Sequence, residues 1–320
     1  MEAAYLSDQH TSSQILNRKR AMPAAHLKAA HLKDRGVIRV SGEDARDFLQ
    51  NIVTNEMDLV TADHAGYGGL LTPQGKIISD FLVIAVPESE GGGFLLDAPL
   101  LQVPDLMKRL KLYKLRAKVA LDDLSEASAV IAATDGSQLP ADAGLTYADP
   151  RLSELGGRAI TDRDGLNEIA SEDMDAYHAR RIALGIPDGG RDFAYGDTFP
   201  HEALFDQLGG VSFKKGCYIG QEVVSRMQHR GTARTRAVPV VFTEGLNPEM
   251  GVEASAGGKS LGHIGSSAGG RGLAMLRLDR VADALAEGQT LAGGGLAFTL
   301  EKPSFLHFLF PGEPGFGAAA

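Results

Sequence analysis

The chain has 320 residues, a formal net charge of -9 and 43% hydrophobic residues. This length accommodates two or three domains, and the acidic balance argues against a general nucleic-acid coat, which needs positive charge to displace counterions from phosphates. The single cysteine excludes an internal disulfide, no apolar run approaches the ~20 residues that span a bilayer, and the N-terminus lacks a signal-peptide pattern. We therefore expect a soluble cytoplasmic protein, with no membrane and no stable nucleic-acid partner.

The first elements are expected after an N-terminal extension. Residues 1–33 show no clear commitment to a core, and we interpret them as a flexible extension. Val37, Ile38 and Val40 predict a strand. Ser41 and Asp44 then have the spacing of a capping box, and apolar residues recur at helical spacing over 45–53. The sequence therefore predicts a strand followed by an amphipathic helix.

The next segment predicts β structure and then a basic helix. Two apolar runs flank the turn signal PQG at 73–75, and FLLDA at 94–98 returns as a strand. Residues 99–113 have one apolar helical face, but six cations fall within the eleven residues 108–118. Either a solvated helix face or a site for an anion, such as a polyglutamate tail or a phosphate, explains these charges. The six are Lys108, Arg109, Lys111, Lys114, Arg116 and Lys118.

The second half of the chain changes from mixed structure to short strands. Residues 119–170 alternate apolar runs with turns, which is typical of a small mixed sheet. Ser171 is expected to cap a helix that Gly185 ends. Residues 186–213 are loop-rich, and the strands after Gly231 are separated by glycine turns, as in a small antiparallel barrel.

These elements define a fold class and domain boundaries. We expect two intertwined α+β domains over residues 34–232, a C-terminal antiparallel β-barrel over 233–310, and a tail over 311–320. The order α+β followed by β lacks the regular βα alternation of a doubly wound sheet.

The segment KKGCYIGQE, residues 214–222, holds the only cysteine. Cys217 follows two lysines and Gly216, and apolar residues recur every four positions over 219–227, which places the thiol near a predicted helix start. Nearby ammonium groups and a helix N-terminus both stabilise a thiolate. The pattern predicts a reactive or ligating thiol, and the alternative is a buried, inert cysteine.

Other catalytic and metal-binding motifs are absent from the sequence. There is no phosphate-binding loop and no dinucleotide fingerprint, and HEALF at 201–205 lacks the second histidine of a zinc-protease helix. One thiol cannot hold an iron–sulfur cluster alone, because clusters normally take four cysteine ligands. We therefore predict no resident metal, with Cys217 as a possible transient ligand.

The stretch FKKGCYIGQEVVSRMQHRG resembles the signature of the YgfZ family, K-G-C-[YF]-x-G-Q-E followed by an arginine. Other blocks that resemble this family extend the similarity over most of the chain. The family is akin to the T-protein of the glycine cleavage system, a tetrahydrofolate-dependent aminomethyltransferase. Eight residues match the signature: Lys215, Gly216, Cys217, Tyr218, Gly220, Gln221, Glu222 and Arg226.

The resemblance implies a T-protein-like arrangement of three domains around a central folate-sized hole. It also implies bound tetrahydrofolate and a role in assembly or repair of iron–sulfur proteins, including enzymes that modify tRNA. The expected partners are therefore folate and iron–sulfur client or assembly proteins, with any cluster bound only transiently.

Two departures from the T-protein concern the folate site. Only Asp80 remains of an acidic pair that orients folate, and the resemblance implies that Asp80 faces this cofactor. Glu202 either contributes to the same cavity or belongs to a surface loop. Ala183 occupies the place of a glutamate that binds the pterin edge, and losing such a charge-assisted bond costs about 1.5–3 kcal/mol.

These residues give one leading hypothesis and two alternatives. In the first, a folate-binding assembly factor uses Cys217 as its working group, and Lys215 keeps the sulfur anionic. Gln221, Glu222 and Arg226 either fix the motif loop or present a polar wall to the ligand. The alternatives are a folate-dependent aminomethyl or one-carbon transferase, which would be a turnover enzyme, and a scaffold without thiol chemistry.

Overall fold

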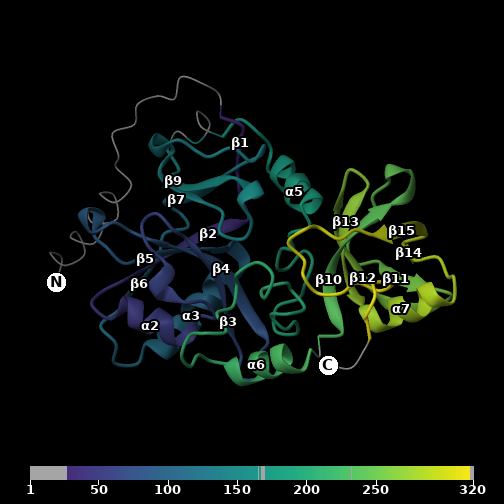
Figure 1. Ribbon diagram of the computed structural model, residues 1–320. Helices are drawn as coiled ribbons and strands as arrows, with labels where there is room; N and C mark the ends of the chain where they lie inside the picture. The colour runs from purple at the N-terminus through teal and green to yellow at the C-terminus, as the bar shows by residue number, and fades with distance from the viewer. Residues whose placement is uncertain (1–26, 165, 167–169, 232, 318–320) are drawn as a thin grey trace. The chain divides into compact units, whose positions relative to one another are not determined.

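The computed structural model describes residues 27–164, 166, 170–231 and 233–317. The chain forms two compact units, whose elements are labelled in Figure 1. Unit 1 comprises Met1–Gly68 and Ser79–Tyr177, and unit 2 comprises Gly69–Ile78 and His178–Ala320. Most of the predicted N-terminal extension, residues 1–26, lies outside the described residues.

A five-stranded sheet, with strand order β3-β4-β5-β2-β6, is the first layer of unit 1. Helices α2 (Ala45–Ile52) and α3 (Val103–Lys114) follow β2 and β5 in the chain. Strand β2 contacts both α3 and a strand of the second sheet, which explains why its five central residues are all buried. The strands are β2 (Arg35–Ser41), β3 (Gly66–Leu71), β4 (Ile77–Ala85), β5 (Phe94–Pro99) and β6 (Ala120–Asp123).

A four-stranded antiparallel sheet of order β1-β7-β9-β8 is the second layer. Its edge strand corrects the predicted extension, because Ala29 and Ala30 are fully buried and pair with Ala133 and Ala132. The folded part of the chain therefore begins before residue 34. The strands are β1 (Ala29–His31), β7 (Ser128–Ala133), β8 (Leu145–Ala148) and β9 (Gly157–Asp162).

Helices α2, α3 and α5 form where the sequence predicts helices, whereas α7 was not predicted; the caps of α2 and α5 also differ from those expected. Asp44 is the N-cap of α2, and its carboxylate accepts a hydrogen bond from the Lys118 amide instead of closing a capping box with Ser41. Helix α5 (Met174–Ala183) begins after Ser171, whose hydroxyl donates to the Leu27 carbonyl. No helix among the described residues is long and apolar enough to cross a membrane.

The C-terminal part of unit 2 is a closed β-barrel of order β10-β13-β12-β11-β14-β15, so the predicted antiparallel barrel is confirmed. Helix α6 (Gln221–Arg230) precedes the barrel, and α7 (Leu278–Ala286) lies between its fourth and fifth strands in chain order. The barrel strands are β10 (Thr235–Phe242), β11 (Glu253–Ala256), β12 (Lys259–Ala268), β13 (Arg271–Arg277), β14 (Ala292–Gly293) and β15 (Leu296–Leu300).

A buried ion network stabilises unit 1. Asp97 on β5 is fully buried and accepts hydrogen bonds from Arg35, Arg158 and the Tyr147 hydroxyl, at 2.7, 2.6 and 2.8 Å. Burial alone raises the pKa of the Asp97 carboxyl, but the Arg158 and Arg35 guanidiniums outweigh it and hold this pKa below the ordinary value of 3.8. The network joins the two sheets, because Arg158 and Tyr147 come from β9 and β8.

The hairpin turn between β3 and β4 packs closely against the start of α6, within unit 2. Gly220 has φ +83, and a Cβ built there would lie 2.6 Å from the Thr72 carbonyl oxygen. Gly75 has φ +81, and its Cβ would lie 2.9 Å from the Val223 side chain. Both positions need glycine for conformation and for space. The predicted turn PQG and the cysteine motif are therefore in direct contact.

We expect Asp97→Asn to destabilise the protein by about 3–5 kcal/mol near pH 7, because it leaves two buried arginines without their carboxylate. Since the folded-state pKa of Asp97 is lowered, its stabilisation is complete above the ordinary pKa of 3.8 and is lost as pH falls through the lower folded value. Denaturant unfolding of both proteins across acidic pH measures this difference.

The exposed pair Glu43 and Lys118 supplies the control, since Glu43→Gln should change stability little at any pH. An Asp97→Asn protein as stable as the wild type would contradict the role of the network.

We expect Gly220→Ala to destabilise unit 2 more than Gly231→Ala. Both glycines have positive φ, but nothing lies within 4 Å of a Cβ at Gly231, whereas a Cβ at Gly220 meets main-chain atoms. The comparison therefore separates the close approach from backbone strain. Thermal unfolding of both variants measures the difference, and equal losses would show that the turn contact contributes nothing.

Candidate functional site

The cysteine motif forms an exposed loop before α6. Cys217 is exposed, and a Cβ built at Gly216 would meet no atom within 4 Å, so the surroundings of the thiol are open. Helix α6 begins at Gln221 with Gly220 as its N-cap. The thiol therefore lies four residues before the helix, outside the turn where a helix terminus acts most strongly. The sequence predicted the thiol at or near a helix start, and the structure places it near this start but not at it.

Lys215 is buried beside Tyr218 rather than projecting into solvent. Its ammonium lies 5.4 Å from the centroid of the Tyr218 ring, and its amide donates to the Ser212 hydroxyl. Burial raises the pKa of Tyr218 to about 12, so this phenol stays protonated and neutral. The cation–π contact between buried Lys215 and Tyr218 stabilises the loop, and it places a positive charge two residues from the thiol.

The polar residues after the thiol lie on the outer surface of α6. Glu222 and Arg226 form an ion pair of 2.8 Å, with 86% and 58% of their side chains exposed. The Gln221 amide donates to the Tyr218 carbonyl, which closes the turn that begins the helix. Glu222 and Arg226 thus pair with each other at the surface, in a geometry available to an incoming partner.

A shallow groove of about 290 Å³ runs beside α6. Val223 and Met227 form one wall of this groove. Both belong to the apolar residues that recur every four positions in the sequence, but they are partly exposed, whereas Val224 is buried. Arg234 and Arg277 bring positive charge to the groove. Its complete lining is Phe199, Glu202, Val223, Met227, Arg234, Thr235 and Arg277.

Glu202 lines this groove and also stabilises a turn. Its carboxylate accepts a hydrogen bond from the Phe199 amide at 2.8 Å. Burial raises the pKa of Glu202, and the Phe199 amide and the Lys76 ammonium oppose this rise. Lys76 lies directly over the Phe199 ring, 3.5 Å from its centroid. The hairpin turn, the groove and the motif helix are thus connected within unit 2.

In the sequence, His201 was notable only as part of an incomplete zinc-protease motif. It is almost fully buried, and its Nε2 lies 2.9 Å from the Gln228 side-chain oxygen on α6. Burial lowers the pKa of His201, which keeps the ring neutral near pH 7. Its Nδ1 has no hydrogen-bond partner among the described residues. His201 therefore anchors the C-terminal half of the motif helix.

Asp80, the predicted folate ligand, is on β4 in unit 1. The residue is 3% exposed, and its carboxylate accepts a hydrogen bond from the Tyr67 hydroxyl at 3.1 Å. Ala183, at the position of the T-protein glutamate, is exposed at the end of α5 and offers no side-chain acceptor. Of the two carboxylates that the T-protein resemblance implies, the one at Asp80 is present and the one at position 183 is not.

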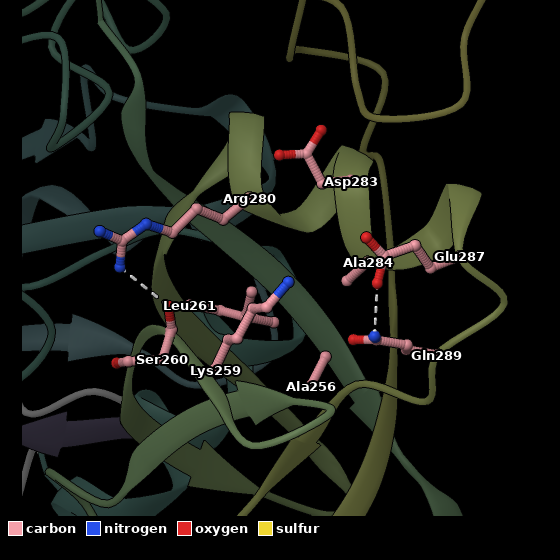
Figure 2. Close-up of a pocket in the computed structure, with 9 residues that line it drawn as sticks. All are labelled: Ala256, Lys259, Ser260, Leu261, Arg280, Asp283, Ala284, Glu287 and Gln289. Atoms are coloured by element: carbon pink, nitrogen blue, oxygen red, sulfur yellow. Dashed lines mark hydrogen bonds between the residues drawn. The ribbon is translucent and has the colours of Figure 1, made fainter.

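A larger cavity of about 450 Å³ lies in the barrel between α7 and the β11–β12 hairpin (Figure 2). Lys259 and Arg280 approach it from the hairpin and the helix, and Asp283 and Glu287 extend from successive turns of α7. None of the predicted site residues lines this cavity. The sequence carried no local signal for it, because its lining comes from two separate segments, 256–261 and 280–289.

Comparison with known proteins supports the fold in two ways. The family model described as the CAF17 C-terminal β-barrel domain matches residues 234–308. A crystal structure of the glycine cleavage system aminomethyltransferase T from Bartonella henselae aligns with a TM-score of 0.67, covering 89% of this chain and 88% of that chain at 15% identity. The predicted T-protein-like fold is therefore confirmed.

The curated relatives are named as iron–sulfur cluster assembly factors. The human mitochondrial protein IBA57 is 33% identical over 276 residues, which cover 78% of this chain and 77% of the human protein. The IBA57 homolog of Pyricularia oryzae is 32% identical, covering 82% of this chain and 74% of that protein. The Mycosarcoma maydis homolog is 34% identical, but the chain covers 57% of its length.

These relatives correct two expectations. Their names place them in mitochondria, which contradicts the predicted cytoplasmic location. A single cysteine indicates a reducing compartment without specifying which one. The resemblance to the YgfZ family holds for the related fold, but the relatives found are IBA57 proteins. With about three quarters of each chain aligned at 33% identity, the chain belongs to the IBA57 family of iron–sulfur cluster assembly factors.

Proposed function

We propose that this chain acts in the assembly or repair of iron–sulfur proteins, including enzymes that modify tRNA, with Cys217 as its working thiol. The observation that carries the proposal is the exposure of the only cysteine on a loop held from below by the buried Lys215. An exposed sulfur can be shared with a second protein, whereas a buried one cannot. The names of the relatives support the same role.

In this role Cys217 contributes one ligand to an iron–sulfur cargo. The thiol loses its proton to solvent, and the thiolate bonds to iron while the partner supplies the remaining ligands. Lys215, two residues before the thiol, brings a positive charge to the same loop. Glu222 and Arg226, one helical turn further on, present opposite charges to the same partner.

We further propose that tetrahydrofolate binds this protein with Asp80 as a ligand. A buried carboxylate fits the donor groups of a pterin edge, and the Tyr67 hydroxyl holds it in position. Folate bound in this way acts as a ligand of an assembly factor, and the names of the relatives give no support to one-carbon transfer.

We expect Cys217→Ser to abolish retention of iron after anaerobic incubation with ferrous iron, sulfide and a small thiol, because a hydroxyl is a poor ligand for these clusters. Visible absorbance and iron content after gel filtration measure the loss. In cells lacking the gene, the same variant should fail to restore the activity of iron–sulfur enzymes.

Gly216→Ala is the matched control, because the added methyl group meets no atom within 4 Å and the thiol remains. It should behave like the wild type. Full restoration of enzyme activity by Cys217→Ser would favour the scaffold hypothesis instead.

For folate, we expect saturable binding of tetrahydrofolate by calorimetry, weakened roughly tenfold or more in Asp80→Asn through loss of a charge-assisted hydrogen bond. Thermal unfolding checks that the fold of the variant is intact. Unchanged affinity in a folded Asp80→Asn protein would remove Asp80 from the site.

A further inference from the structure

Three leucines within and next to helix α3 are exposed to solvent. Its buried side contacts the sheet through Val103, Leu106, Met107 and Leu110. Leu101 before the helix, Leu112 in its last turn and Leu115 after it are 92%, 68% and 85% exposed. Leu112 lies about 180° around the helix from the buried side, as the 3.6-residue period requires. The described structure of unit 1 gives these three side chains no cover.

Leu115 occupies a backbone position that disfavours leucine. Its φ of 47 and ψ of -108 match the first central position of a type II′ turn, where glycine is preferred. The Ala117 amide donates to the Lys114 carbonyl at 2.8 Å and closes this turn. A leucine here strains the main chain and leaves an apolar side chain in water. Neither the turn nor the core accounts for it.

Cations surround these leucines in an otherwise acidic chain. Two of the six predicted cations are neutralised, since Arg109 pairs with Asp105 and Lys118 pairs with Glu43. The other four form no ion pair with any residue in the part of the chain that the structure describes. They are Lys108, Lys111, Lys114 and Arg116.

We propose that this surface binds an anionic lipid interface from one side of the membrane. The α3 surface is defined as Leu101, Lys108, Lys111, Leu112, Lys114, Leu115 and Arg116. Leucines at the level of the acyl boundary, with lysines reaching the phosphates, form the usual pattern of interfacial binding. This differs from the expectation of no membrane partner, which rested on the absence of a spanning segment.

The spacing of the leucines favours a lipid surface over a protein pocket. Leu101 lies in a 3-10 turn (Leu100–Gln102) before α3 and Leu112 in the last turn of α3, so most of the helix, about 14 Å long between Val103 and Leu112, separates them. A fluid interface receives each leucine independently, whereas a folded partner would need separate pockets at matching distances. The four cations lie within residues 108–116, beside Leu112 and Leu115, where they can reach the phosphates around these two side chains.

The test is co-sedimentation of the full chain with phosphatidylcholine vesicles and with vesicles in which about a third of the lipid is phosphatidylglycerol. We expect binding to the anionic vesicles alone, weakening as salt is raised. Leu115→Gly should reduce vesicle binding roughly tenfold or more through the lost apolar contact. The same variant relieves the turn, so its thermal midpoint should equal or exceed that of the wild type. Lys111→Gln should reduce binding about fivefold.

Controls come from unit 2. Met250→Ser removes an apolar side chain that is 59% exposed, and Lys259→Gln removes the same charge from the barrel. Both should bind anionic vesicles like the wild type. The proposal is overturned if the wild-type chain does not sediment with anionic vesicles, as expected for a surface that binds a protein. Undiminished binding by a double Leu115→Gly, Lys111→Gln variant would overturn it equally.

Discussion

The exposed thiol depends on a contact between two stretches of main chain. The β3–β4 turn approaches the start of α6 so closely that Gly220 and Gly75 leave no room for a side chain. Because main chain is stiffer than side chain, this contact fixes where α6 begins and therefore where the preceding loop must emerge. Lys215 beneath the loop and His201 beneath the helix add polar anchors in the same unit. The thiol is exposed on a rigid support, which is suitable for presenting one ligand to a partner.

Local patterns in the sequence predicted the elements well where apolar period and turn residues agreed. The barrel was recognisable from its glycine turns, and the helix over 45–53 from its apolar face. Strand β1 was missed because two alanines have little intrinsic preference for strands. Their burial comes from pairing with β7, about a hundred residues away, which no local pattern contains. The Ser171 cap failed for the same reason, since its hydroxyl bonds to Leu27.

At the candidate site, the sequence identified the residue types but not which side chains are buried. Two lysines precede the thiol, and only the structure shows that Lys215 is buried against Tyr218. The groove beside α6 draws on residues from Phe199 to Arg277, so no single motif could predict it. The helix start was misplaced because Gly220, with its positive φ, delays helical geometry to the next residue. Gly220 fits either a loop position or an N-cap, and the residues next to it in the sequence do not show which of the two forms.

The β3–β4 hairpin, which carries the PQG turn, contributes residues to both units. Its tip, Gly69–Ile78, belongs to unit 2, while the strands on either side continue into unit 1. The tip is held by main-chain bonds between Ile77 and residues 196 and 198, so the contact closes a loop of about 120 residues. Neither unit is a contiguous piece of the gene, and a cut after Tyr177 would separate the tip from its partners. Ribosomal synthesis therefore delivers the tip long before the segment that receives it, and contacts of such high sequence separation form slowly.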